Sequence, residues 1–139
     1  MILHATARFT PRSDAGRFVS AVIAPGVEEG VLLVADRILA TAQLIAPEKT
    51  GELRDSGKIA VERTDRTITA SVVFDAPHAG YVEYGTGRRG ESSAGAGPYA
   101  YNPNWPGMEA RPFLRPALDE ERGNAASDMA GKISLRLNQ

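Results

Sequence analysis

The segment from Gly26 to Ala46 constrains the fold most strongly. Its apolar residues recur at steps of three and four, which is the repeat of a buried helix face. They are Val27, Val31, Val34, Ile38, Ala42 and Ile45, widened by Leu32, Leu39 and Ala46. Pro47 ends the helix, because the residue before a proline avoids helical backbone angles. We therefore predict a long helix over about residues 27–46, buried on more than one side.

Two segments with a different period follow. Apolar and polar residues alternate from Lys58 to Arg63 and from Thr67 to Phe74, as in half-buried strands. The polar residues between them predict a β-hairpin over 58–74. Leu3 to Phe9 alternates in the same way, so residues 1–22 are expected to form an N-terminal strand region with a turn at 11–16.

The C-terminal part predicts a second helix over about residues 112–137. Apolar residues keep a helical spacing from Leu114 to Leu137, and prolines occur only where its first turn is expected. Gly123-Asn124 is expected to kink or split this helix. The predicted fold class is α+β, a small antiparallel sheet packed against both helices. A chain of 139 residues is expected to form a single domain, residues 1–139.

Composition excludes several classes of site. The chain has no cysteine, which rules out disulfides, thiolate zinc sites and cysteine nucleophiles. Its net charge of −1 gives no overall field that would recruit nucleic acid. The longest strongly apolar run, Val31 to Ala35, is far too short to span a bilayer, and no signal-peptide pattern opens the chain. We expect a soluble protein made in a reducing cytoplasm, with no membrane partner.

Residues 76–90, which we call the elbow segment, connect the predicted sheet to a long loop. Pro77 stops the preceding strand because it has no N–H for a ladder hydrogen bond. Tyr81, Val82 and Tyr84 predict one turn of apolar surface before a run of closely spaced glycines. The segment is therefore expected to be a shaped, semi-rigid connection rather than a reaction centre.

No catalytic, metal or cofactor site is predicted. Asp75, His78 and Glu83 are the only histidine-plus-acid cluster, and a metal site would need more convergent ligands. A turn aspartate and a surface histidine are the favoured interpretation. Residues 85–90 are glycine-rich but lack the Gly-Lys-Ser/Thr ending of a phosphate-binding loop. The protein is expected not to be an enzyme.

The loop over residues 88–110 is the strongest candidate for a binding function. Loops of this length are uncommon in compact domains, and its aromatic residues argue against simple disorder. These aromatics either fold back over the protein's own sheet or anchor on another subunit, and the loop length favours the second. Arg88 and Arg89 are equally consistent with a solvated pair and with ion pairs to a neighbouring chain; nucleic acid is less favoured. The candidate interface residues are Tyr81, Glu83, Tyr84, Arg88, Arg89, Tyr99, Tyr101, Trp105, Arg111, Phe113 and Arg115.

Three segments together resemble a known bacteriophage family. Residues 46–56 are similar to its "APxxTGxLRxS" signature, residues 81–87 to its "YxxYVEFGTG" box, and residues 110–118 to its "ARPFLRPAL" box. Their order and rough spacing agree over about residues 25–139. The chain thus resembles the "gene product ten" family of minor virion proteins of long-tailed phages, which are usually assigned to tail completion or head–tail joining.

The resemblance implies a structural virion protein with no enzymatic activity. It implies a homo-oligomeric ring, expected to be a hexamer, in the neck between the head connector or adaptor and the tail terminator or tail tube. DNA would only pass through the lumen of such a ring. The protein would be made in the host bacterial cytoplasm and end in the virion.

Two alternatives remain open from the sequence. The first is another place in the same particle, as a tail terminator or other minor tail protein. The second is a small nucleic-acid-binding or hydrolytic accessory protein that would use His78, Glu83, Arg88 and Arg89.

Overall fold

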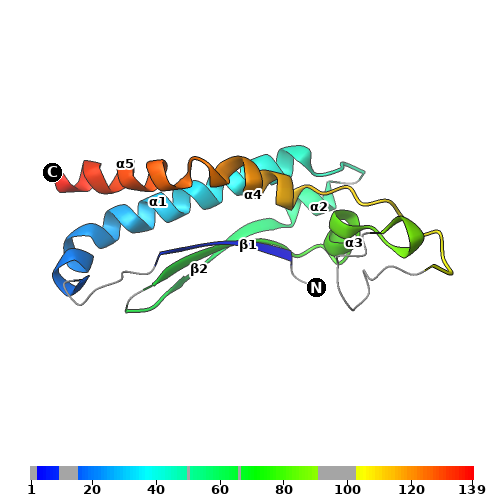
Figure 1. The fold of residues 1–139 in the computed structure, drawn as a ribbon, viewed down its shortest axis with the longest axis horizontal. Coiled ribbons are helices and arrows are strands. Elements are labelled where there is room, and N and C mark those ends of the chain that lie inside the picture. Colours follow the sequence, from blue (N-terminus) through cyan, green and yellow to red (C-terminus); the bar gives the residue numbers. More distant parts are fainter. Residues whose placement is uncertain (1–2, 10–15, 50, 66, 91–102) are drawn as a thin grey trace.

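The fold is α+β and elongated, with a helical layer above a three-stranded sheet (Figure 1). The computed structural model describes residues 3–9, 16–49, 51–65, 67–90 and 103–139, with side chains from Ala24 onward. The elements in chain order are β1 (Leu3–Phe9), α1 (Gly16–Ile45), α2 (Glu52–Asp55), β2 (Gly57–Arg63), β3 (Ile68–Phe74), α3 (Ala79–Tyr84), η1 (Gly87–Arg89), α4 (Leu114–Arg122) and α5 (Ala125–Leu137).

The sheet is antiparallel with strand order β1-β3-β2. The hairpin partners β2 and β3 pair from Gly57 opposite Phe74 to Arg63 opposite Ile68. β1 pairs with the other edge of β3, from Leu3 opposite Phe74 to Phe9 opposite Ile68. The predicted hairpin and the predicted N-terminal strand are therefore both confirmed, and the last strand in sequence is the central one.

The helical layer is built around a close approach of α1 and α5. A Cβ atom added at Gly26 would lie 2.8 Å from the Cα of Ile133, and one at Gly30 would lie 2.8 Å from the Cα of Met129. Only glycine at these two positions lets the backbones come so near. As Figure 1 shows, α4 and α5 run back along α1, and α5 lies on the side of α1 away from the sheet.

Ion pairs join α1 to its neighbours on both sides. Glu28 accepts hydrogen bonds from Arg63 at the end of β2, and Glu29 accepts them from Arg136 of α5. The Arg63 hydrogen bond lowers the pKa of Glu28 below its usual 4.5, and the Arg136 hydrogen bond lowers that of Glu29 likewise. These pairs are mostly solvated, so each contributes little to stability at neutral pH.

The structure corrects two predictions near the N-terminus. The long helix begins at Gly16, about ten residues before the predicted start, and Pro25 lies inside it. The strand therefore occupies only part of the predicted N-terminal strand region. The expected break at Gly123-Asn124 is confirmed, because the predicted helix over 112–137 is two helices, α4 and α5. The predicted turn at 11–16 falls mostly on residues outside the described chain.

The early start of α1 has a simple physical explanation. Proline removes one hydrogen bond from a helix interior and disfavours helical angles in the residue before it. The predicted helix began just after Pro25. The helix continues through Pro25 all the same, because tertiary contacts can outweigh a local propensity of a few kcal/mol.

The core lies between α1, the sheet and the start of α4. Phe74 of β3 and Phe113, just before α4, are both fully buried. Their ring centroids are 5.0 Å apart at an interplanar angle of 81°, an edge-to-face arrangement. Ala46 and Leu53 belong to the same buried cluster. The contact between Phe74 and Phe113 fixes the chain after the loop to the sheet and so positions the elbow segment.

Candidate assembly surface

The centre of the elbow segment is the buried carboxylate of Glu83. Glu83 lies in α3, and its side chain is 0% exposed. One oxygen, Oε2, accepts hydrogen bonds from the backbone N–H groups of Phe113 at 2.8 Å and Leu114 at 3.0 Å. The other, Oε1, accepts one from the N–H of Arg115 at 3.1 Å. Glu83 thus caps the N-terminus of α4, where unpaired N–H groups and the helix dipole favour a negative charge.

Arg115 completes this cluster. Its Nε donates to Glu83 Oε1 at 2.8 Å, and its terminal nitrogen donates to the Glu83 carbonyl at 2.9 Å. Its guanidinium also lies 4.8 Å from the centre of the Tyr84 ring, a cation–π distance. A buried charge is tolerated when it is paired and fully hydrogen-bonded, and Glu83 meets both conditions. The elbow segment and the start of α4 therefore form one structural unit.

The chain returns from the loop and pairs with the elbow segment. We call residues 103–113 the returning arm. Thr86 donates its N–H to the Met108 carbonyl at 2.8 Å, and the Met108 N–H reaches both the carbonyl and the hydroxyl of Thr86, at 3.1 and 2.9 Å. Arg88 N–H donates to the Trp105 carbonyl at 2.8 Å, and Arg111 N–H donates to the Val82 carbonyl at 2.8 Å. These bonds hold the arm along the elbow segment.

Glycines make this close pairing possible. Gly85, Gly87 and Gly107 all have positive φ, at 72°, 61° and 62°. A Cβ at Gly107 would lie 1.9 Å from the Thr86 carbonyl oxygen, and one at Gly87 would lie 2.4 Å from that of Trp105. A side chain at either position would collide with backbone in a strained conformation. The glycine run thus serves tight pairing, whereas the sequence indicated only a freed backbone.

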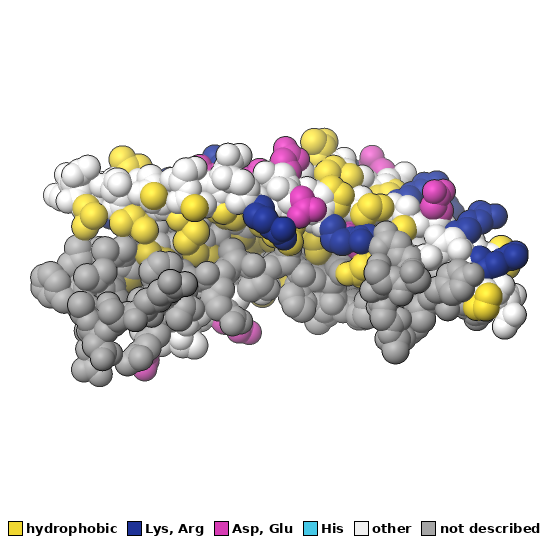
Figure 2. All heavy atoms as spheres, in the orientation of Figure 1, with side chains coloured by type: hydrophobic (Ala, Val, Ile, Leu, Met, Phe, Trp, Pro, Cys, Tyr) yellow, Lys and Arg dark blue, Asp and Glu magenta, His cyan; other side chains and the backbone are white. Residues whose placement is uncertain are grey.

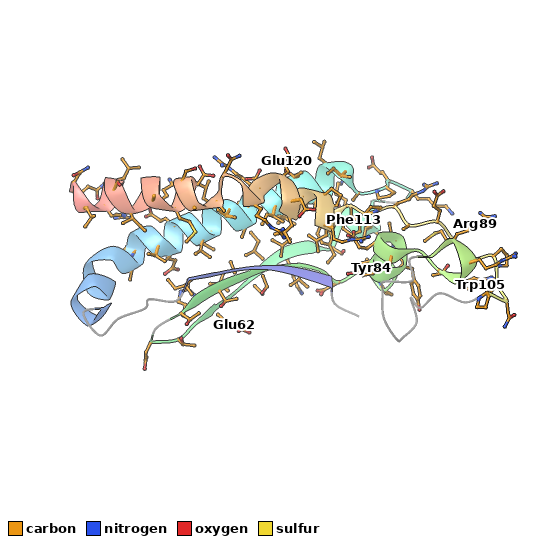
Figure 3. All side chains as sticks on the ribbon, in the orientation of Figure 1. Glu62, Tyr84, Arg89, Trp105, Phe113 and Glu120 are labelled. Carbon is orange, nitrogen blue, oxygen red and sulfur yellow. The ribbon has the colours of Figure 1, made fainter. Side chains whose placement is uncertain are left out.

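The predicted interface residues differ in how far they are exposed. Arg88, Arg89, Trp105 and Arg111 are exposed, and Figure 3 shows Arg89 and Trp105 together at the end of the molecule beyond α3. Tyr81, Tyr84 and Arg115 are half-buried. Glu83 and Phe113 are buried and serve the protein's own interior. Tyr99 and Tyr101 lie outside the described residues.

The exposed group has a common structural support. We call Arg88, Arg89 and Trp105 the tip. Arg88 and Trp105 are joined by a backbone hydrogen bond, and Trp105 is 53% exposed. Figure 2 shows Lys and Arg side chains gathered at this end of the molecule. A large aromatic surface beside arginines, held on a fixed backbone, has the composition of a protein-binding anchor.

The hydrogen bonds around Glu83 give it a structural role rather than a catalytic or metal-binding one. A carboxylate offers about four acceptor sites, and four N–H groups occupy the two oxygens of Glu83. No site is left for a water to be activated or a metal to be held. Among the residues with described positions, no group of three or more His, Asp or Glu side chains could bind a metal ion. The sequence signal that pairs Glu83 with residues 113–115 is weak, because thirty positions separate them.

Residues 19–85 match the family model described as "HK97-gp10_like: Bacteriophage HK97-gp10, putative tail-component". This segment matches the gene product ten family. The match confirms the resemblance seen in the sequence, and it covers the first two boxes up to Gly85. The third box, which holds Phe113 and Arg115, lies beyond it.

The gene product ten match supports a structural, tail-related phage protein. Such a component implies contacts with other virion proteins and a location in the virion. No curated protein and no solved structure matches the chain. None of the described helices combines the length and the apolar character needed to cross a membrane.

Proposed function

We propose that this protein is a non-enzymatic head–tail joining or tail-completion subunit of a long-tailed phage. It assembles into a hexameric ring between the head connector and the tail terminator or tail tube. The observation that carries the proposal is the family match over residues 19–85. DNA passes through the lumen of the ring and is not otherwise a partner.

The geometry supports an assembly role for the tip. Arg88, Arg89 and Trp105 are exposed on a backbone that is hydrogen-bonded to the returning arm. Glu83 and Phe113 fix that framework to α4 and to the sheet. A preformed surface loses little conformational freedom on binding, which favours specific assembly.

A complementation experiment tests the proposal. A phage lacking this gene is supplied with the protein or with the variant Arg88→Ala/Arg89→Ala, and particles are imaged by electron microscopy. With the unchanged protein we expect joined particles. With Arg88→Ala/Arg89→Ala we expect filled heads and finished tails that are not joined. Arg122→Ala is the matched control, because its side chain is 71% exposed on α4 and it pairs only weakly with Asp119. Particles joined normally without any supplied protein would overturn the proposal.

The same experiment separates the alternatives. Missing or unterminated tails would assign the protein to tail building, as a tail terminator or other minor tail protein. A salt-sensitive affinity for DNA that is lost in Arg88→Ala/Arg89→Ala would instead favour a nucleic-acid-binding role. A hydrolytic role for Glu83 is disfavoured by its burial and its four donors.

A further inference from the structure

The outer face of α1 carries an exposed row of side chains. Asp36, Ala40 and Leu44 are four residues apart, so they follow one another along one side of the helix. Asp36 is rotated by roughly 160° about the helix axis from each of two buried residues, Val34 and Ile38. Leu44 is 86% exposed. No element in the described part of the chain covers this row.

An unpaired acid of α4 lies on the same side of the molecule. Arg37 Nη1 is 3.9 Å from Glu121 Oε2, so α1 and α4 lie side by side at this level. Asp36 and Glu120 each immediately precede one of these two residues. Figure 3 places Glu120 on the side of α4 that is turned away from the sheet. Within the described residues neither Asp36 nor Glu120 has an ion-pair partner, whereas Arg37 and Glu121 do.

The tip has the complementary properties. Arg88 and Arg89 are exposed and make no ion pair with any described residue. Their neighbour Trp105 presents an apolar ring. The chain therefore carries two different unpaired surfaces, one basic and aromatic, the other acidic and aliphatic. Arginine–carboxylate pairs combined with a buried aromatic are typical anchors of protein interfaces.

We infer that the tip of one copy seats on the row formed by Asp36, Ala40, Leu44 and Glu120 of a second copy. Arg88 and Arg89 pair with Asp36 and Glu120, while Trp105 covers Ala40 and Leu44. Because the two surfaces differ, the contact is head-to-tail and repeats from copy to copy, closing into a ring when the rotation permits. This inference rests on the proposed function and names the partner of its interface.

Charge reversal provides the first test. Arg88→Glu/Arg89→Glu and Asp36→Lys/Glu120→Lys each place like charges across the contact. We expect each variant to lower the yield of joined particles by about tenfold or more. The quadruple variant restores opposite charges and is expected to recover most of the yield. Circular dichroism of each purified variant checks that the fold is intact. A quadruple variant that is no better than the two double variants would overturn the inference.

Engineered cysteines provide a second test, since the natural chain has none. In particles that carry Arg89→Cys/Ala40→Cys, mild oxidation with copper phenanthroline is expected to give a ladder of linked copies. Each single variant is the control and is expected to stay monomeric on a non-reducing gel. Dimers from one single variant alone would show a contact between identical surfaces and would overturn the head-to-tail arrangement, as would the absence of a ladder.

The two tests separate this inference from the proposed function. If no ladder forms while Arg88→Ala/Arg89→Ala still leaves heads and tails apart, the tip binds another virion protein and the proposed function stands. If a ladder forms but particles join without this protein, the contact between copies stands and the joining role fails.

Discussion

The Glu83 carboxylate and Arg115 lie 32 positions apart in the sequence and are in direct contact, with Arg115 Nε donating to Glu83 Oε1 at 2.8 Å. The same carboxylate caps α4 through the N–H groups of Phe113, Leu114 and Arg115. Two of the three segments that resemble the family's motifs are thus joined in one hydrogen-bonded unit. The exposed tip depends on that unit for its position.

Glu83→Gln is expected to destabilise the protein by about 2–4 kcal/mol, because a neutral amide accepts fewer of these bonds and leaves buried donors unpaired. The measurement is urea denaturation followed by circular dichroism. Glu109→Gln is the control, since Glu109 is exposed and is expected to change stability by less than about 0.5 kcal/mol. Equal midpoints for the two variants would contradict the assigned cap.

Gly107→Ala is expected to detach the returning arm. Its Cβ would meet the Thr86 carbonyl oxygen at a φ of 62°, at a local cost of about 1–3 kcal/mol. Trp105 is the only tryptophan, so its fluorescence reports on the arm directly. We expect the fluorescence transition of this variant to occur at lower urea than the circular dichroism transition. Coincident transitions would indicate that the arm is not a separate unit.

Gly30→Ala tests the close approach of α1 and α5. Alanine favours a helix interior by about 1 kcal/mol over glycine, but its Cβ would lie 2.8 Å from the Cα of Met129. We expect a net loss of about 1–3 kcal/mol from overpacking, seen as a lower thermal midpoint.

Gly131→Ala is the matched control for that variant. Gly131 lies in α5, and a Cβ there would have no neighbour within 4 Å. We expect this variant to stabilise the protein by about 0.5–1 kcal/mol. Stabilisation by both alanines would show that the two helices are not in close contact.

Stability is expected to fall at acid pH partly through Glu28 and Glu29. Their pKa values in the folded protein are lowered from 4.5 by Arg63 and Arg136. Their contribution is therefore complete above about pH 4.5 and is lost as pH falls through the lower folded values. Urea midpoints measured from pH 7 to pH 3 should decline less in Glu28→Gln/Glu29→Gln. A decline as steep as that of the unchanged protein would contradict this assignment.

The sequence by itself determined the elements whose signal is local. Alternation of side chains specified β1 and the hairpin of β2 and β3, because a strand repeats every two residues. The helical repeat specified most of α1, and Gly123-Asn124 marked the break between α4 and α5. Three sequence segments also pointed to the family, since a motif resemblance needs no spatial information, and the family match over residues 19–85 covers the first and most of the second.

Only the tertiary structure decided what joins segments far apart in the chain. In the structure, α1 continues through Pro25, and residues 103–113 pair with the elbow segment. Glu83 and Phe113, which were interface candidates from the sequence, are buried. The physical reason is that burial and hydrogen-bond partners depend on distances in space. A charged residue such as Glu83 is expected at the surface unless the N–H groups that donate to its carboxylate are known.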